Sequence, residues 1–399
     1  MTMRAAEEDD AIDGVRPSYV ATPESTDEVA ELLRTAAERG MHVVAKGSGT
    51  KQRWGNPPSR LDLVVETTAL SGVVEHAAGD LITVVRAGTT LTELAGVLAT
   101  ADQQLALDAP LPSATLGGTV AANTSGPRRL LYGTMRDLLI GITFVRADGV
   151  VAKAGGKVVK NVAGYDFGKL LTGSHGTLGL VTEVALRLHP LPKVRLAVTA
   201  ELTDGDDAAA ACLRLLGSQV VPAAVEVDQP VDGPVSVAVL LEGVEAGVGA
   251  RAAETQRLLG AASIDADAPA WFGSYPFGED EVGLKITTTL SGLGPILSAA
   301  REIGRRHDVR LALRGSAAGV LHAAMPADTE PPVVRRVLEE LRALAAMYDG
   351  TVVVLTGPAR TRHALDVWGP VAGLDLMLRL KDQLDPEHRL SPGRFVGGI

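Results

Sequence analysis

Hydrophobic positions along this chain repeat with two different periods, and each period predicts its own kind of element. Between residues 25 and 40, apolar side chains return every three or four positions, which predicts an amphipathic helix. Ser25 followed three residues later by Glu28 has the form of a capping box at the start, and Gly40 ends the pattern. The apolar run 41–46 then predicts a strand that leads into a glycine-rich loop.

In the first half of the chain, short apolar runs separated by turn residues predict further strands. Asp148-Gly149 lies between two of these runs and predicts a hairpin turn. A helix is expected to begin near Thr90, and the small residues and glycines of 110–127 predict a loop. The strands expected here are 16–23, 61–66, 81–86, 138–146, 150–154 and 178–188.

The pattern changes after His189-Pro-Leu-Pro192, where we place a domain boundary. Beyond it, strands and helices alternate, which predicts an α+β sheet covered by helices on one face. The expected strands are 195–202, 224–227, 235–241, 284–290, 310–314, 320–324 and 351–355. The expected helices are 208–216, 250–259, 295–307 and 331–348.

Composition narrows the possible functions. A chain of 399 residues favours two domains. A formal net charge of −10 without a basic cluster argues against a general nucleic-acid binder. The single cysteine, Cys212, excludes an internal disulfide framework and a cysteine-ligated iron–sulfur cluster, and its apolar surroundings predict a buried helix face.

The N-terminus and the longest apolar runs bear on location. Residues 1–10 are acidic and lack the apolar core of a signal peptide. No apolar run reaches the roughly 18 residues that a membrane span needs. We therefore expect a cytoplasmic protein without a direct membrane span, which could dock at the inner face of a membrane through partners.

A first loop with chemical potential is Lys46-Gly-Ser-Gly-Thr50. Glycines on both sides of a hydroxyl residue after a strand can present backbone N–H groups to a phosphate. The spacing fits neither the dinucleotide-binding G-x-G-x-x-G pattern nor a Walker loop. An ordinary turn is the alternative interpretation of this loop taken alone.

Two further segments combine small residues with polar groups. In the segment 112–127, hydroxyl residues and glycines leave the backbone accessible, and Ala121 and Ala122 leave room for a bulky planar ligand. The segment 160–184, KNVAGYDFGKLLTGSHGTLGLVTEV, places ionisable side chains among closely spaced glycines. Ordered glycine costs conformational entropy, so this density predicts that the backbone turns sharply or approaches a ligand closely.

These segments, together with YGTMRDLLIG at 132–141, resemble the FAD-binding domain of the vanillyl-alcohol oxidase (PCMH) type. Within that family the chain is similar to the smaller FAD-binding subunits of bacterial glycolate oxidases, and its ending LDPEHRLSPGR resembles the family's closing tail. The resemblance implies a two-part FAD-binding domain over 16–192. It further implies an α+β, ferredoxin-like cap domain over 193–380 and a C-terminal tail over 381–399 that packs back on the FAD domain.

The resemblance implies FAD as the cofactor. Many relatives attach it to a histidine of the first loop, but Thr50 and Lys51 occupy the corresponding positions here, so non-covalent FAD is expected. The first two loops would hold the pyrophosphate, 123–126 would lie along the ribityl chain and the isoalloxazine, and the late glycines would meet the adenine or the flavin edge. The FAD-binding residues expected are Lys46, Gly47, Ser48, Gly49, Thr50, Pro112, Thr115, Leu116, Gly117, Gly118, Ala122, Asn123, Ser125, Gly126, Tyr132, Gly133, Asn161, Gly176, Gly179 and Val181.

Candidates for direct roles in catalysis are few. Tyr165 either contacts the flavin site or positions its loop. Lys157 either stabilises charge on the reduced ring or forms a surface ion pair. Arg394 could bind a substrate carboxylate with two hydrogen bonds or anchor the tail by a salt bridge.

Large catalytic relatives that oxidise D-2-hydroxy acids carry a metal site in the second domain, and the resemblance places His322 at one of its ligands. Gly315 stands at the place of the first histidine, and 351–357 lacks the later glutamate–histidine pair. One histidine does not make a dependable metal site, so we assign no metal and interpret His322 mainly as a sheet residue.

Two hypotheses about the function follow. In the first, the chain is an FAD-dependent subunit of a glycolate oxidase-like complex that oxidises a small 2-hydroxy acid such as glycolate or D-lactate, with a hydride passing to FAD. In the second, it is a flavin-bearing accessory or electron-transfer subunit whose larger partner acts on the substrate. Both imply a larger FAD subunit and an iron–sulfur subunit as partners. A stand-alone sugar or alditol oxidase is a third option.

Overall fold

The computed structural model describes residues 3–157 and 164–399. These residues form two compact units, which are treated separately here. The first unit contains the residues up to Ser125, then Thr134–Leu191 and Pro370–Ile399. The second unit contains Gly126–Gly133 and Pro192–Gly369.

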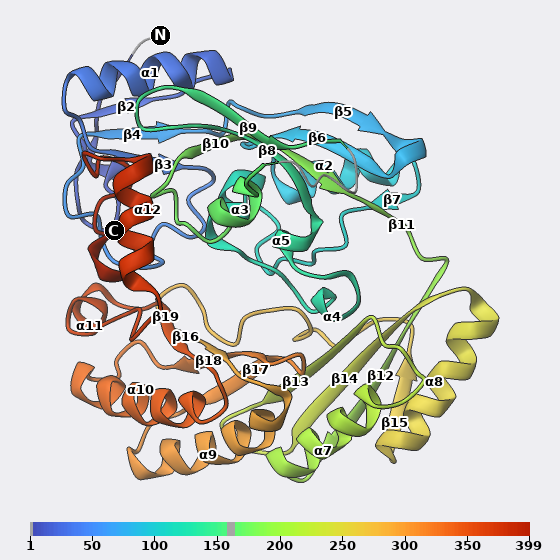
Figure 1. The fold of residues 1–399 in the computed structure, drawn as a ribbon. Coiled ribbons are helices and arrows are strands. Elements are labelled where there is room, and N and C mark those ends of the chain that lie inside the picture. Colours follow the sequence, from blue (N-terminus) through green and yellow to red (C-terminus); the bar gives the residue numbers. More distant parts are fainter. Residues whose placement is uncertain (1–2, 158–163) are drawn as a thin grey trace. The chain divides into compact units, whose positions relative to one another are not determined.

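The first unit has two sheets (Figure 1). One has the order β1-β2-β4-β3, with β4 parallel to both β2 and β3. The other has the order β5-β6-β10-β8-β9 and is antiparallel throughout. The strands are β1 (Arg4–Ala5), β2 (Tyr19–Ala21), β3 (Val43–Lys46), β4 (Leu63–Glu66), β5 (Val73–Ala77), β6 (Ile82–Arg86), β8 (Leu139–Val145), β9 (Val151–Gly155) and β10 (Leu180–Arg187). A short pair, β7 (Gln103–Gln104) with β11 (His189–Pro190), lies outside these sheets.

The first helix, α1 (Thr26–Glu38), begins where the sequence predicts. The hydroxyl oxygen of Ser25 accepts a hydrogen bond from the N–H of Glu28 at 3.2 Å. The carboxylate of Glu28 accepts from the N–H of Glu24 at 2.9 Å, one residue before the position that a capping box predicts. The other helices of this unit are α2 (Leu91–Ala99), α3 (Leu116–Ala122), α5 (Met135–Leu138), α6 (Phe167–Leu171) and α12 (Leu374–Leu384).

The prediction of a loop over 110–127 is wrong, because α3 occupies part of it. Thr115 caps the helix by accepting from the N–H of Gly118 at 3.3 Å. Gly117 packs so closely on β6's end that a Cβ atom there would lie 2.9 Å from Cβ of Ala87. Each of the two glycines costs about 1 kcal/mol of helix propensity, so the sequence does not reveal the helix, although Gly117 is needed for its close packing.

The C-terminal segment returns to the first unit through a buried ion pair. Nζ of Lys381 in α12 donates to the carboxylate of Asp385 at 2.6 Å, and to the backbone carbonyl oxygens of Thr177 at 2.7 Å and Leu390 at 2.9 Å. Both charged side chains are fully buried. Because Thr177 lies in the glycine-rich segment, Lys381 joins the tail to the rest of the first unit.

The second unit contains, within the described residues, an eight-stranded antiparallel sheet in the order β15-β12-β14-β13-β17-β18-β16-β19. Its chain order is strand–helix–strand–strand–helix–strand twice over, which makes two ferredoxin-like halves joined side by side through β13 and β17. The first half is β12 (Val194–Leu202), α7 (Gly205–Leu216), β13 (Ala224–Gln229), β14 (Val235–Gly243), α8 (Glu245–Leu259) and β15 (Ala262–Asp265). The second half is β16 (Val282–Thr287), α9 (Leu293–Arg306), β17 (Ala312–Ser316), β18 (Val320–Met325), α10 (Pro331–Ala346) and β19 (Val352–Thr356).

The helices α7 to α10 cover one face of this sheet (Figure 1), as the sequence predicts. Alternate strand residues such as Val237, Leu284 and Leu321 form an aliphatic core with them, and Cys212 of α7 is buried there. Burial raises the pKa of the Cys212 thiol to about 12. The opposite face, which we call the helix-free face because none of α7 to α10 covers it, carries the intervening residues of each strand.

Two short helices complete the second unit, α4 (Arg129–Tyr132) and α11 (Ala359–His363). Across the described residues of both units, no helix has the length and apolar character that a bilayer crossing requires.

Candidate cofactor site

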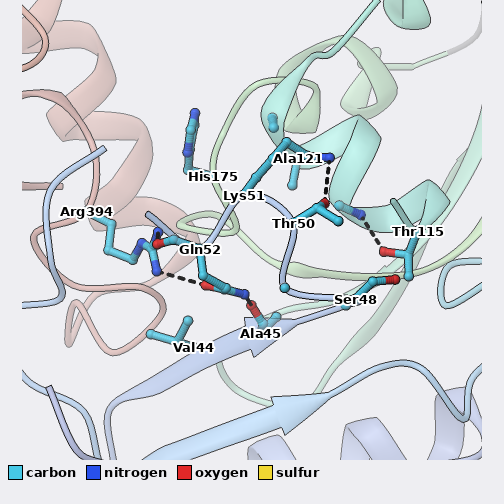
Figure 2. A pocket seen from close by; sticks show the side chains of 14 residues that line it. Val44, Ala45, Ser48, Thr50, Lys51, Gln52, Thr115, Ala121, His175 and Arg394 are labelled. Carbon is cyan, nitrogen blue, oxygen red and sulfur yellow. Dashed lines mark hydrogen bonds between the residues drawn. The ribbon is translucent and has the colours of Figure 1, made fainter. Parts of the chain in front are cut away.

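A hollow of about 520 Å³, open to solvent, lies in the first unit between the loop after β3 and the helix α3 (Figure 2). The closing tail and the glycine-rich segment each contribute one residue to its wall. The lining residues are Val44, Ala45, Gly47, Ser48, Gly49, Thr50, Lys51, Gln52, Thr115, Gly118, Ala121, Ala122, His175 and Arg394.

The loop after β3 approaches α3 very closely. A Cβ atom on Gly47 would lie 2.2 Å from Oγ1 of Thr115, so only glycine fits there without displacing the helix cap. Gly49 has φ +77°, which a residue with a side chain rarely adopts. The two glycines therefore bring the loop backbone to the rim of the hollow, where its N–H groups can meet an anion.

Two basic side chains line the same hollow. Lys51 lies close to Thr50, with its Nζ 3.4 Å from the hydroxyl oxygen (Figure 2), and burial lowers its pKa to about 8. Arg394 comes from the tail and donates to the backbone oxygen of Gln52 at 2.7 Å and to that of Trp54 at 3.0 Å. A bound pyrophosphate would supply the negative charge that favours protonated Lys51.

Asn123 ends α3 beside this wall with φ 49°, in the left-handed region. Its Oδ1 atom is buried and has no hydrogen-bond partner among the described residues. A buried polar atom without a partner costs free energy, which a donor group on a ligand could recover. The narrow glycine loop, the basic lining and this acceptor together fit FAD, a ligand with a pyrophosphate and several hydroxyl groups.

The hollow brings together many of the residues expected to bind FAD. Gly47, Ser48, Gly49, Thr50, Thr115, Gly118 and Ala122 all line it. Lys46 stands at the end of β3, and its Nζ forms an ion pair with Glu66 at 3.2 Å. The first two loops thus meet at one place, although they are separated by more than 60 residues of sequence.

Other expected residues have their side chains in the core. Leu116 and Val181 are buried in the cluster around the second sheet. Gly179 packs on a ring, since a Cβ atom there would lie 2.7 Å from Cδ2 of Phe144. The Ser125 hydroxyl oxygen accepts from the N–H of Met135 at 2.9 Å. Any contact that these residues make with FAD would have to come mainly from their backbone.

Pro112 and Gly176 lie in connecting segments. The carbonyl oxygen of Pro112 accepts from the hydroxyl of Thr92 at 3.0 Å, which fixes the loop that precedes α3. Gly176 has φ +74° and faces the tail, where a Cβ atom would lie 3.3 Å from Oγ of Ser391.

The remaining candidates are not among the residues that line the hollow. Gly126, Tyr132 and Gly133 belong to the second unit, where the Tyr132 hydroxyl donates to the carboxylate of Glu242 at 2.8 Å. Burial, and next the bond to Glu242, raise the pKa of Tyr132 to about 12. Asn161 lies outside the described residues, and the side chain of Tyr165 is highly exposed, at 88%.

The sequence analysis did not assign FAD contacts to several lining residues. Lys51 and Gln52 directly continue the first loop, and His175 lies inside the glycine-rich segment, so proximity to a predicted loop was the available signal. The ring of His175 stacks on Phe395 of the tail with 5.6 Å between centroids. Lys157 forms the ion pair with Glu75 that its surface interpretation predicts.

In the second unit, His322 lies on the helix-free face, with its ring edge-on to Tyr275 at 4.8 Å. Across the described residues, histidines, cysteines and carboxylates nowhere gather in a group of three or more that could hold a metal ion.

Comparison with known proteins supports the cofactor. Residues 17–155 match the family model described as an FAD binding domain. The glycolate oxidase subunit GlcD of Bacillus subtilis is 28% identical over 425 residues, covering 95% of this chain and 89% of the relative. Two shorter matches are GlcE of Escherichia coli, 35% identical over 175 residues, and D-lactate dehydrogenase of Archaeoglobus fulgidus, 31% identical over 207 residues. These cover 43% and 52% of this chain, and 49% and 46% of the relatives.

Among solved structures, p-cresol methylhydroxylase has a TM-score of 0.75 at 15% sequence identity, covering 95% of this chain and 89% of its own. This likeness shows the fold, an FAD-binding domain of the PCMH type with an α+β second domain. The chain carries an FAD binding domain and is an FAD-dependent oxidoreductase related to the glycolate oxidase and D-lactate dehydrogenase families.

Proposed function

We propose that this chain is a subunit of a glycolate oxidase-like complex that oxidises a small 2-hydroxy acid, glycolate or D-lactate, with non-covalent FAD. The observation that carries the proposal is the alignment with a glycolate oxidase subunit over 95% of the chain. The D-lactate dehydrogenase match supports the same substrate class. The proposed partners are a larger FAD subunit and an iron–sulfur subunit that receives the electrons.

FAD, when bound, supplies a hydride acceptor. The chain's own residues account for holding it. The loop 47–50 and the cap of α3 would bind the pyrophosphate with backbone N–H groups, and Lys51 would add a positive charge. Thr50 and Lys51 occupy the loop where a histidine would be needed for covalent attachment, so the flavin should remain exchangeable.

Purification tests the cofactor and the substrate in sequence. The isolated chain should be yellow, and acid precipitation should leave the yellow colour in the supernatant. Anaerobic addition of glycolate or D-lactate should then bleach the flavin absorbance. A colourless chain that takes up no added FAD would refute the proposal at its first step.

A second function is favoured by the match to GlcE, which covers 43% of this chain at 35% identity. In this alternative the chain carries flavin but its larger partner acts on the substrate. Bleaching of the isolated chain by either acid would exclude it. Bleaching by sugars or alditols, and by neither acid, would instead point to a stand-alone oxidase.

A further inference from the structure

A fully buried lysine, Lys381 of α12, joins the glycine-rich segment to the tail. Its Nζ donates to the carboxylate of Asp385 at 2.6 Å and to the carbonyl oxygens of Thr177 at 2.7 Å and Leu390 at 2.9 Å. An ammonium group has three donors, so each donor has an acceptor of its own. These acceptors lie on both sides of the contact between the two segments.

The tail continues from this point along β3, the strand that leads into the first loop. The N–H of Val43 donates to the carbonyl oxygen of Arg389 at 2.8 Å, and the N–H of Ser391 donates to that of Val43 at 2.7 Å. The N–H of Ser59 donates to the carbonyl oxygen of Pro392 at 2.8 Å. The tail is therefore bound both to β3 and to the chain that follows the first loop.

Each of the two segments that Lys381 joins places one side chain on the wall of the hollow. Arg394 comes from the tail and His175 from the glycine-rich segment (Figure 2). Nη1 of Arg394 donates to Oε1 of Gln52 at 3.1 Å, and the N–H of His175 donates to the carbonyl oxygen of Ala121 in α3 at 2.9 Å. The positions of both side chains thus depend on the contact that Lys381 makes.

Stability alone does not explain a buried charge pair at this place. Burying an ion pair costs hydration free energy, and apolar side chains of similar volume often serve a fold as well. Oδ1 of Asp385 is also buried and has no hydrogen-bond partner among the described residues, which adds to the cost. The ammonium group provides directed hydrogen bonds that no apolar side chain could replace, and these set the distance between Thr177 and Leu390.

We propose that Lys381 is a positioning residue of the FAD site. It joins Thr177 to Leu390 and so places His175 and Arg394 on the wall of the hollow. Lys381 does not line the hollow itself, so it acts on FAD through these two residues. Coupling of this kind is reciprocal: loss of the Lys381 hydrogen bonds should weaken FAD binding, and bound FAD should hold the tail in place.

The test variant removes both buried charges together, because Lys381→Met alone would leave a buried carboxylate without its counter-charge and destabilise the fold. In Lys381→Met/Asp385→Asn, the asparagine oxygen can still accept the N–H of Leu390. Fluorescence titration of the flavin-free chain with FAD, below the melting temperature, should show binding weakened by about tenfold or more, equal to about 1.4 kcal/mol. A role in stability alone would lower the melting temperature but leave this dissociation constant unchanged.

The matched control removes a second ion pair of the same part of the chain. Asp382 and His388 form this pair at 2.7 Å, with side chains that are 57% and 41% exposed. His388 has φ 52°, which asparagine also tolerates, so the control is Asp382→Asn/His388→Asn. It should bind FAD as the wild type does. Equal dissociation constants for Lys381→Met/Asp385→Asn and this control would overturn the proposal.

Hydrogen exchange in the wild type tests the reciprocal effect without any substitution. Bound FAD should slow exchange of the amide groups in 385–399 by about threefold more than in α1, a helix of the same unit that contributes no residue to the wall of the hollow. FAD that only stabilised the unit as a whole would slow exchange in both segments equally. That result would contradict the coupling between FAD and the tail.

The inference rests on FAD as the cofactor and fails separately from the proposed function. If neither glycolate nor D-lactate bleaches the flavin while FAD affinity still depends on Lys381, the positioning role stands and the substrate assignment falls. If either acid bleaches the flavin of the wild type while Lys381→Met/Asp385→Asn binds FAD with wild-type affinity, the function stands and the positioning role falls.

Discussion

The two ferredoxin-like halves of the second unit share one topology. They differ in whether the charged side chains on the helix-free face are paired with opposite charges. In the first half, Glu242 is buried and receives Arg195 at 2.8 Å, Arg128 at 3.2 Å and the Tyr132 hydroxyl at 2.8 Å. In the second half, no carboxylate of the described residues forms an ion pair with Lys285. In the first arrangement the buried carboxylate is paired entirely by groups of the same unit, and these contacts stabilise the unit. The second leaves the positive charge of Lys285 without a counter-charge among the described residues.

The largest effect on stability should come from removing the carboxylate of Glu242 in the first half. Glu242→Gln leaves the buried guanidinium of Arg128 without its carboxylate, and such a change typically costs about 3–5 kcal/mol. We expect a clearly lower denaturation midpoint for the second unit in urea. Glu201→Gln, at an exposed position of the neighbouring strand β12, is the matched control and should leave the midpoint unchanged. A Glu242→Gln midpoint equal to that of the control would mean that the network does not stabilise this half.

In the second half, removing the charge of Lys285 should raise stability rather than lower it. Lys285→Met removes a charge that is poorly solvated and lies near Arg129, so the variant should be more stable than the wild type at pH 7, by up to about 3 kcal/mol. Thermal unfolding without substrate measures the difference. A loss of stability would show that Lys285 has a structural partner, and the contrast between the halves would disappear.

The pH dependence of stability should show separately how much the unpaired Lys285 of the second half destabilises the fold. Folded Lys285 releases its proton near pH 8, whereas in the unfolded chain it does so near 10.5. Between these values the unfolded state binds more protons, so stability should rise with pH by at most about 1.4 kcal/mol per unit. Below about pH 8 the penalty is constant, and above about 10.5 it is gone.

The other groups facing Lys285 should contribute little over this range. Arg129 stays charged, and His322 is already neutral. Burial raises the pKa of Tyr275, so it keeps its proton. Subtracting the curve of Lys285→Met from that of the wild type isolates the effect of the lysine. A flat difference between pH 8 and 10.5 would contradict the lowered pKa.

Much of this architecture could be predicted from local sequence. The strands and helices expected in the second unit were all found, because apolar periodicity is a local property, although β15 and α11 were not predicted. The helix α3 was not predicted, because Gly117 is explained only by its contact with Ala87, a residue 30 positions away. The ferredoxin-like repeat was visible as an alternation, but the joining of β13 to β17 needed the structure.

In the candidate sites, too, local sequence marks some residues and only the structure identifies others. The loop 46–50 and the Thr115 region were predicted to bind FAD because glycine and hydroxyl residues mark them directly, and the structure brings residues 47–50 and Thr115 together at one hollow. His322 attracted attention because the resemblance pointed to it, whereas Lys285 carried no motif. Only strand register shows that the two are opposite each other.

The smallest effect extends the comparison to the first unit, where two lysines of one loop differ as the two halves do. Lys46 has a counter-charge in Glu66 at 3.2 Å, whereas Lys51 lines the hollow and burial lowers its pKa to about 8. Lys51→Met should therefore weaken FAD binding by about tenfold, since a charge-assisted hydrogen bond contributes about 1.5–3 kcal/mol and part of it will be replaced by water. Lys46→Met, its control, should change FAD affinity less than threefold, because its charge is already neutralised by Glu66. Fluorescence titration of the flavin-free chain with FAD measures both constants, and a larger loss for Lys46→Met would reverse this assignment and place the pyrophosphate at the end of β3.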